Sequence, residues 1–156
     1  GRGPDGVTWN TEADYRQVGE ELGLALFDQL GLGLTASTWS YGLPCASLML
    51  AAALTPQLDG SHDANLAIVG GPSSGLGVLA VGNSQVVQPL PSPWANCALL
   101  TPPVGTAILV LSPAGAAVTS LSVPAIPGLA AYLQVVSLDA ALNLDASNGV
   151  VIENNY

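Results

Sequence analysis

The chain has 156 residues, of which 49% are hydrophobic, and its formal net charge is −9. This length and composition suit one folded domain with an appendage and exclude a disordered tail. The only permanent cations are Arg2 and Arg16, so little is available to neutralise phosphates and no nucleic-acid partner is expected. The longest apolar run, Leu43–Leu54, contains Pro and Cys and is shorter than the ~20 residues that span a bilayer.

Residues 1–34 differ in pattern from the rest of the chain. Gly1–Gly6 is typical of an extended arm, and Thr11–Asp14 has the capping residue and the acids that begin a helix. Gly19 and Gly23 lie four residues apart within the expected helix, where they would let another backbone approach closely, or are simply tolerated as weak helix formers. Apolar residues follow helical spacing at Tyr15, Val18, Leu22, Leu26 and Leu30.

From Thr35 onward the pattern changes to short strands separated by Gly, Pro, Asn and Asp turn residues. Ala117–Val123 has the clearest alternation, with Ala117, Thr119, Leu121 and Val123 on one face. Further strands are expected at 35–41, 48–54, 65–69, 77–81, 85–88, 106–111, 131–138 and 149–153. Seven to nine short strands predict an all-β, antiparallel β-sandwich over residues 35–156, preceded by the arm and the one helix of residues 1–34.

Cys45 and Cys97 are the only cysteines. An even count in a chain of secreted character predicts one disulfide, the alternative being two buried free thiols. Mainly from these two cysteines, and because the chain begins at Gly1 and not at Met, we interpret it as a processed secreted protein, extracellular or on a cell surface. A bridge that closes a loop of about fifty residues would stabilise the fold by about 4 kcal/mol in the chain-entropy model.

Short motifs occur in a fixed order along the body. They are Tyr41–Cys45, Pro56–Gly60, Pro89–Pro91, Cys97–Leu100, Val123–Leu129, Tyr132–Gln134, Leu138–Asp139 and Ser147–Gly149. Their order resembles the C-terminal β-sandwich module of large secreted proteins from planctomycete-type bacteria, over about residues 35–156. That family usually has Gly before its first cysteine, whereas this chain has Pro44, so the local turn is expected to differ. The resemblance implies a secreted accessory or surface module with Cys45 and Cys97 at the matching cysteine positions, and it brings no catalytic residues.

No motif in the chain points to catalysis, and we expect neither an enzyme nor a cofactor. His62 is the only histidine and lies in a segment typical of a turn, without a nucleophile elbow anywhere in the chain. Calcium has a weak candidate set in Asp59, Asp63 and Asn65, with Asp139 and Asp145 as a second pair. The alternative is that these are solvated turn residues.

Two functions are consistent with these features. The body has almost none of the charge that normally discourages pairing between strand edges. Together with the separate arm, this favours a structural subunit that self-assembles into an extracellular homopolymer, a filament or sheet. Residues expected at the contact between copies are Arg2, Trp9, Arg16, Gly19 and Gly23. The alternative is a monomeric secreted module that binds polysaccharide or a cell surface. The aromatic candidates for contact with a sugar are Trp9, Trp39 and Trp94. The other interpretation is that Trp39 is a core residue and that Trp94 packs against the disulfide.

Overall fold

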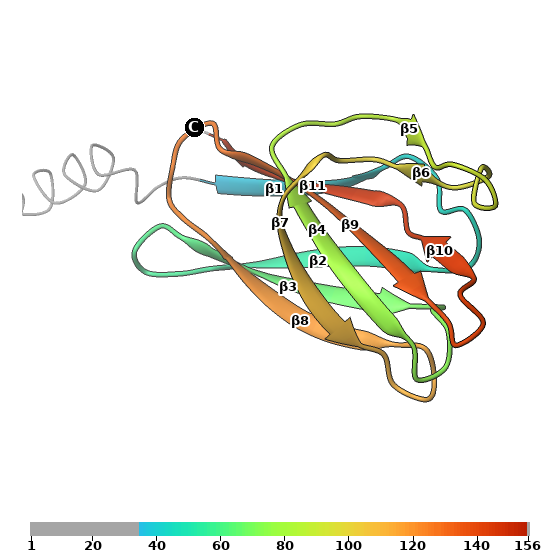
Figure 1. Ribbon diagram of the computed structural model, residues 1–156. Coiled ribbons are helices and arrows are strands. Elements are labelled where there is room, and N and C mark those ends of the chain that lie inside the picture. Colours follow the sequence, from blue (N-terminus) through green and yellow to red (C-terminus); the bar gives the residue numbers. More distant parts are fainter. Residues whose placement is uncertain (1–34, 156) are drawn as a thin grey trace, which may run out of the picture.

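The computed structural model describes residues 35–155, and every regular element in that range is a β-strand (Figure 1). The strands are β1 (Thr35–Tyr41), β2 (Met49–Pro56), β3 (His62–Val69), β4 (Leu76–Gly82), β5 (Gln88–Pro89), β6 (Ala98–Leu99), β7 (Pro103–Val110), β8 (Ala117–Val123), β9 (Ala130–Leu138), β10 (Leu144–Ala146) and β11 (Gly149–Asn155). The expected all-β, antiparallel architecture is therefore confirmed. The expected arm and helix fall in residues 1–34, outside the described residues.

The expected count of seven to nine strands was too low, because the described residues form eleven. Three of the strands, β5, β6 and β10, have only two or three residues each. Segments this short show no hydrophobic period, so the alternation rule cannot find them.

The strands form two main antiparallel sheets (Figure 1). The larger sheet has the order β1-β11-β9-β4-β7, with β10 paired to the second half of β9, and the smaller sheet has the order β2-β3-β8. β5 and β6 pair only with each other. β7 is an edge strand of the larger sheet, and β8, the next strand along the chain, is an edge strand of the smaller sheet. The chain therefore passes from one sheet to the other between these two edge strands.

The hydrophobic core lies between the two sheets and follows from the two-residue period of their strands. In β3, Ala64, Leu66 and Ile68 are fully buried while the residues between them are more exposed. The larger sheet contributes Leu133, Val135, Val150 and Ile152, among others, to the same cluster. The expected alternation of β8 is confirmed, because its burial alternates along the strand up to the buried Val123.

Side chains from the larger sheet also bind the edge of the smaller one. The Asn148 side chain accepts a hydrogen bond from the Leu50 amide at 3.0 Å and donates one to the Leu50 carbonyl at 2.9 Å. Asp145 accepts hydrogen bonds from the amides of Ser47 and Leu48. The first part of the β2 edge is thus occupied by polar groups of the same chain.

Candidate functional site

The outer face of the larger sheet is divided into a covered half and a bare half. Residues 83–102, here called the cover segment, include β5 and β6 and lie over the half that contains Tyr41, Tyr132 and Gln134. The expected disulfide is present, since Cys45 is bonded to Cys97 of the cover segment. A disulfide between cysteines 52 residues apart is typical of proteins that fold in an oxidising, extracellular environment.

Gln134 is the main polar attachment of the cover segment to the sheet. Its side chain is fully buried, accepts a hydrogen bond from the Leu100 amide at 2.9 Å, and donates to the Ala98 and Ser147 carbonyls at 3.0 Å each. Both N–H donors of the side-chain amide and one of the two acceptor positions on its oxygen are therefore used. The cover segment is held as part of the folded body.

Tyr41 makes a second attachment. Its hydroxyl donates to the Leu100 carbonyl at 3.0 Å, and its ring meets Tyr132 edge to face with ring centroids 6.0 Å apart. Burial, and secondarily the neighbouring Tyr132, raises the pKa of Tyr41 to about 12. Gly149 lies opposite Tyr41 in the sheet, and a side chain there would collide with the Tyr41 ring.

A surface hollow of about 510 Å³ lies where the cover segment meets the turn between β9 and β10. Trp94 and Asn96 line it from the cover segment, and Leu142 and Asn143 line it from the turn. An aromatic ring beside two side-chain amides combines an apolar surface with hydrogen-bonding groups, which is the chemistry that suits a sugar ring. This hollow is the described feature that best fits the binding of a small polar ligand.

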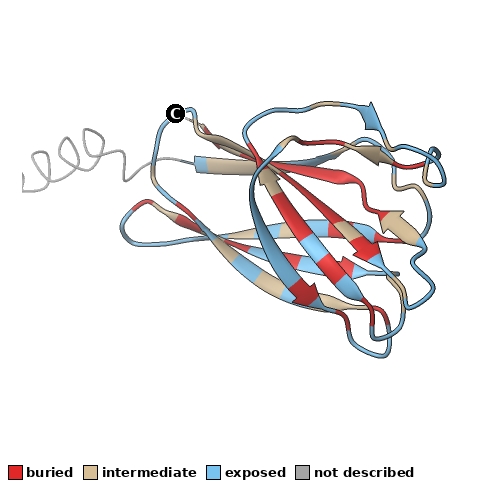
Figure 2. Ribbon diagram, in the orientation of Figure 1, coloured by how far each residue is buried: buried red, intermediate tan, exposed pale blue. Residues whose placement is uncertain are grey.

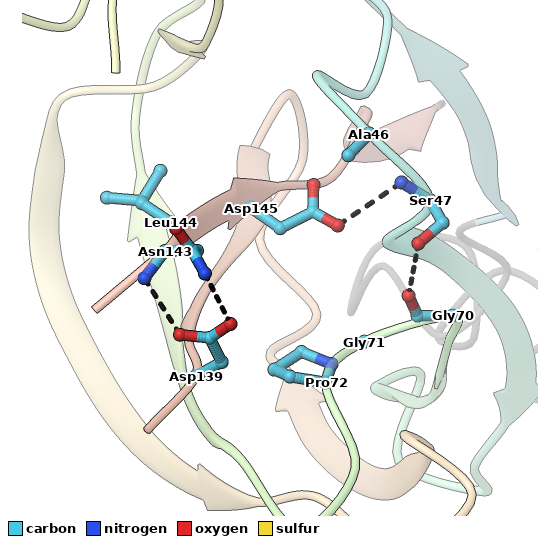
Figure 3. A pocket seen from close by; sticks show the side chains of 9 residues that line it. All are labelled: Ala46, Ser47, Gly70, Gly71, Pro72, Asp139, Asn143, Leu144 and Asp145. Atoms are coloured by element: carbon cyan, nitrogen blue, oxygen red, sulfur yellow. Dashed lines mark hydrogen bonds between the residues drawn. The ribbon is translucent and has the colours of Figure 1, made fainter. Parts of the chain in front are cut away.

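A second hollow, of about 260 Å³, adjoins the first and contains both acids of the second calcium pair (Figure 3). Asp139 accepts hydrogen bonds from the Asn143 side chain and amide, which lower its carboxyl pKa. Asp145 is bound to the Ser47 and Leu48 amides. Each carboxylate thus holds a turn or a strand start in place, and sequence order alone did not show that the two share a hollow.

The first calcium set does not converge on one point. Asp59 accepts hydrogen bonds from the hydroxyl and amide of Ser61, which lower its carboxyl pKa, whereas Asp63 accepts one from Gln57. Asn65 donates to the Thr55 hydroxyl across the β2–β3 pair. Within residues 35–155 no three acidic, His or Cys side chains gather where they could hold one metal ion.

His62 lies in a strand and not in the turn expected from its neighbours. It begins β3, is 5% exposed, and its Nδ1 has no hydrogen-bond partner among the described residues. The turn comprises the residues before it, where Gln57 and Ser61 are bonded to each other. The sequence reasoning failed here because the turn residues Asp59 and Gly60 are so close to the start of the strand.

The bare half of the outer face is apolar. It is formed by two rows of three side chains from the neighbouring strands β7, β4 and β9: Val110, Leu76 and Leu138 in one row, and Ile108, Val78 and Val136 in the other. We call these six residues the bare face. Five of them are exposed, from 39% for Leu138 to 79% for Ile108. Figure 2 shows the exposure of β7, which is pale blue along most of its length.

The outermost strands of both sheets share a composition that bears on assembly. None of β1, β2, β7 and β8 contains Asp, Glu, Lys, Arg or His. No described strand pairs with the outer edge of β7 or β8. The expectation of uncharged edges, made from the overall composition, is confirmed for these four strands.

The residues expected at the contact between copies, Arg2, Trp9, Arg16, Gly19 and Gly23, all lie outside the described residues. The bare face was missed at the level of sequence. The sequence pattern that indicates it lies in residues 106–111. There Ile108 and Val110 are apolar at alternate positions where a solvent-facing strand face normally has polar residues. A strand that is apolar on both faces is usually buried on both, so the pattern alone does not reveal an exposed face.

No helix among residues 35–155 is long and apolar enough to cross a membrane. Comparison with known proteins found no matching family model, no matching curated protein and no matching solved structure.

Proposed function

We propose that this chain is the subunit of a secreted, extracellular homopolymer, a filament or sheet, that assembles through its N-terminal arm. The observation that carries the proposal is the absence of any charged residue in the four outermost strands. Charged side chains at strand edges, Lys above all, discourage pairing between soluble β-proteins. A body without them suits a protein whose surfaces meet copies of themselves.

The bare face supports the same proposal by its size. With the exposed fractions of its side chains, it presents about 500 Å² of apolar surface, near the upper end for the largest patch on a monomer. A partner surface of equal size would bring the buried total to about 1,000 Å², where specific interfaces begin. The disulfide is consistent with a material that works outside the cell.

Electron microscopy of negatively stained, non-reduced protein tests the proposal over a range of concentrations. A variant lacking residues 1–10 is imaged beside the full chain. We expect regular assemblies from the full chain and their loss on deletion, since the arm is proposed to make the contact. Compact single particles from both samples at every concentration would refute the homopolymer.

A monomeric polysaccharide-binding module is the second candidate, and the hollow lined by Trp94, Asn96 and Asn143 favours it. It predicts retention of the chain on an insoluble polysaccharide and loss of retention in Trp94→Ala. Trp39→Ala is the matched control, because Trp39 is 44% exposed on β1 and does not line the hollow. Equal retention of the two variants would argue against a sugar site at Trp94.

A further inference from the structure

The outer edge of β7 has open backbone groups, and the ladder that joins β7 to β4 fixes their positions. Leu111 donates a backbone hydrogen bond at 3.0 Å to the carbonyl of Gly75, which lies opposite it when the β4–β7 register is continued by one residue. Residues that are bonded to the partner strand alternate with unbonded ones along an antiparallel pair. The backbone N–H and C=O groups of Thr106, Ile108 and Val110 therefore point away from β4.

Only the beginning of this edge has the features that normally prevent pairing with another strand. Pro103 begins the strand, and the β4–β7 register shifts between Val81 and Gly82. From Gly105 to Val110 the strand has no charged residue, no Pro and no register shift, and no described strand pairs with its outer side. An exposed edge of this kind is a template for pairing with a further strand.

The open residues of β7 are complementary to their own copy. When a second copy presents the same edge in the antiparallel direction, Ile108 lies opposite Ile108 of that copy, and Thr106 lies opposite its Val110. This register uses every open N–H and C=O group of the three residues. Other registers with the same alternation place Thr106 or Val110 opposite residues outside 105–110, where the edge is protected or the strand has ended.

The side chains beside the open edge also suit a second copy. Ile108 is 79% exposed, and the pairing places the two Ile108 side chains next to each other, where β-branched residues pack well across strands. The edge strand β8 lies at the same side of the sandwich, because β1 and β2 contact each other at the opposite side. Since β8 also lacks charged residues, neither of these strands brings like charges together when two copies meet.

We propose that the β7 edge of each copy pairs with the β7 edge of a second copy and joins their larger sheets into one. The inference goes beyond the proposed function, because this contact lies in the described body and does not use the N-terminal arm. The contact is isologous and closes at two copies. It therefore links chains in pairs, whereas the arm is the contact proposed to extend the polymer.

Cysteine substitutions in the full chain test the register. Opposite residues of a hydrogen-bonded antiparallel pair have Cα atoms about 5.5 Å apart, which a disulfide can bridge. Ile108→Cys should therefore cross-link two copies under mild oxidation. Thr106→Cys alone should not, because four residues of strand separate the two copies of that position by about 14 Å. Thr106→Cys mixed with Val110→Cys should form a mixed dimer, and peptide mapping checks that the Cys45–Cys97 bridge is retained.

A second comparison tests the backbone hydrogen bonds. Ile108→Pro removes an N–H that points outward, so it leaves the β4–β7 ladder intact, and edge strands accept Pro at such positions. With Ile108→Pro in both chains, the mixed cross-link between Thr106→Cys and Val110→Cys should form about 10-fold more slowly or less. The matched control is Ile108→Thr in both chains, which keeps the N–H and a β-branched side chain and should cross-link normally. Circular dichroism checks that all variants are folded.

The other outcomes overturn the pairing and are distinguishable from a failure of the homopolymer. Equal cross-linking of Ile108→Cys and Thr106→Cys would indicate chance collision, and equal rates with Ile108→Pro and Ile108→Thr would exclude the backbone bonds. No cross-link in Ile108→Cys would mean that the edge stays free or is covered by the chain's own residues 1–34. Regular assemblies without this cross-link would refute the pairing and leave the homopolymer standing, whereas cross-linked pairs without regular assemblies would do the reverse.

Discussion

Replacing Gln134 by Leu should strongly destabilise the fold, although the two side chains have similar sizes. The substitution removes three hydrogen bonds from a fully buried site and supplies no replacement for the Leu100 amide or for the Ala98 and Ser147 carbonyls. A buried polar group without a partner costs about 1–3 kcal/mol. With two to three such groups, the free energy of unfolding should fall by about 3–6 kcal/mol, a large part of an ordinary domain's total stability.

Equilibrium unfolding in urea, followed by tryptophan fluorescence, measures this loss. Gln88→Leu is the control, because Gln88 is exposed on β5 and its replacement should change stability by about 0.5 kcal/mol at most. Hydrogen exchange at the Leu100 amide locates the effect, since this group should lose its protection. A loss below about 1 kcal/mol in Gln134→Leu, or an equal loss in the control, would refute the role given to Gln134.

Three further predictions concern the neighbouring contacts. Replacing both Cys45 and Cys97 by Ser should lower the free energy of unfolding by about 4 kcal/mol; an unchanged urea midpoint would contradict this. The pKa of Tyr41 is raised to about 12, so the folded state keeps a proton that the unfolded state releases near pH 10. Its stabilisation is complete below pH 10 and is lost as the pH rises to 12, and Tyr41→Phe should flatten the fall in unfolding temperature over that range; an identical fall in both proteins would count against it. Gly149→Ala should cost about 1–3 kcal/mol, because the added methyl meets the Tyr41 ring; a wild-type melting temperature would show that the ring moves aside freely.

The sequence predicted the features that depend on local patterns, such as alternating hydrophobicity and the number of cysteines. The boundaries expected for 35–41 and 117–123 agree with β1 and β8, and the expected disulfide is formed. The features around the cover segment could not be predicted in the same way. Gln134 lies between the core residues Leu133 and Val135, and nothing in that local pattern says that its side chain reaches a segment more than thirty residues away. The two hollows also depend on which turns the fold brings together, and this is decided by strand order.

The absence of Lys and Arg from the body also affects how the protein withstands digestion. Proteases of the trypsin type cut only after Lys or Arg, because an acid in their specificity pocket must be paired. After Arg16 the chain contains neither residue. Brief local opening, which exposes most secreted proteins to cleavage, gives such an enzyme no site in the described body. Trypsin would therefore cut only after Arg2 and Arg16 and leave the β-sandwich whole. The part of a lasting material that such an enzyme can remove is the N-terminal arm, through which the copies are proposed to join.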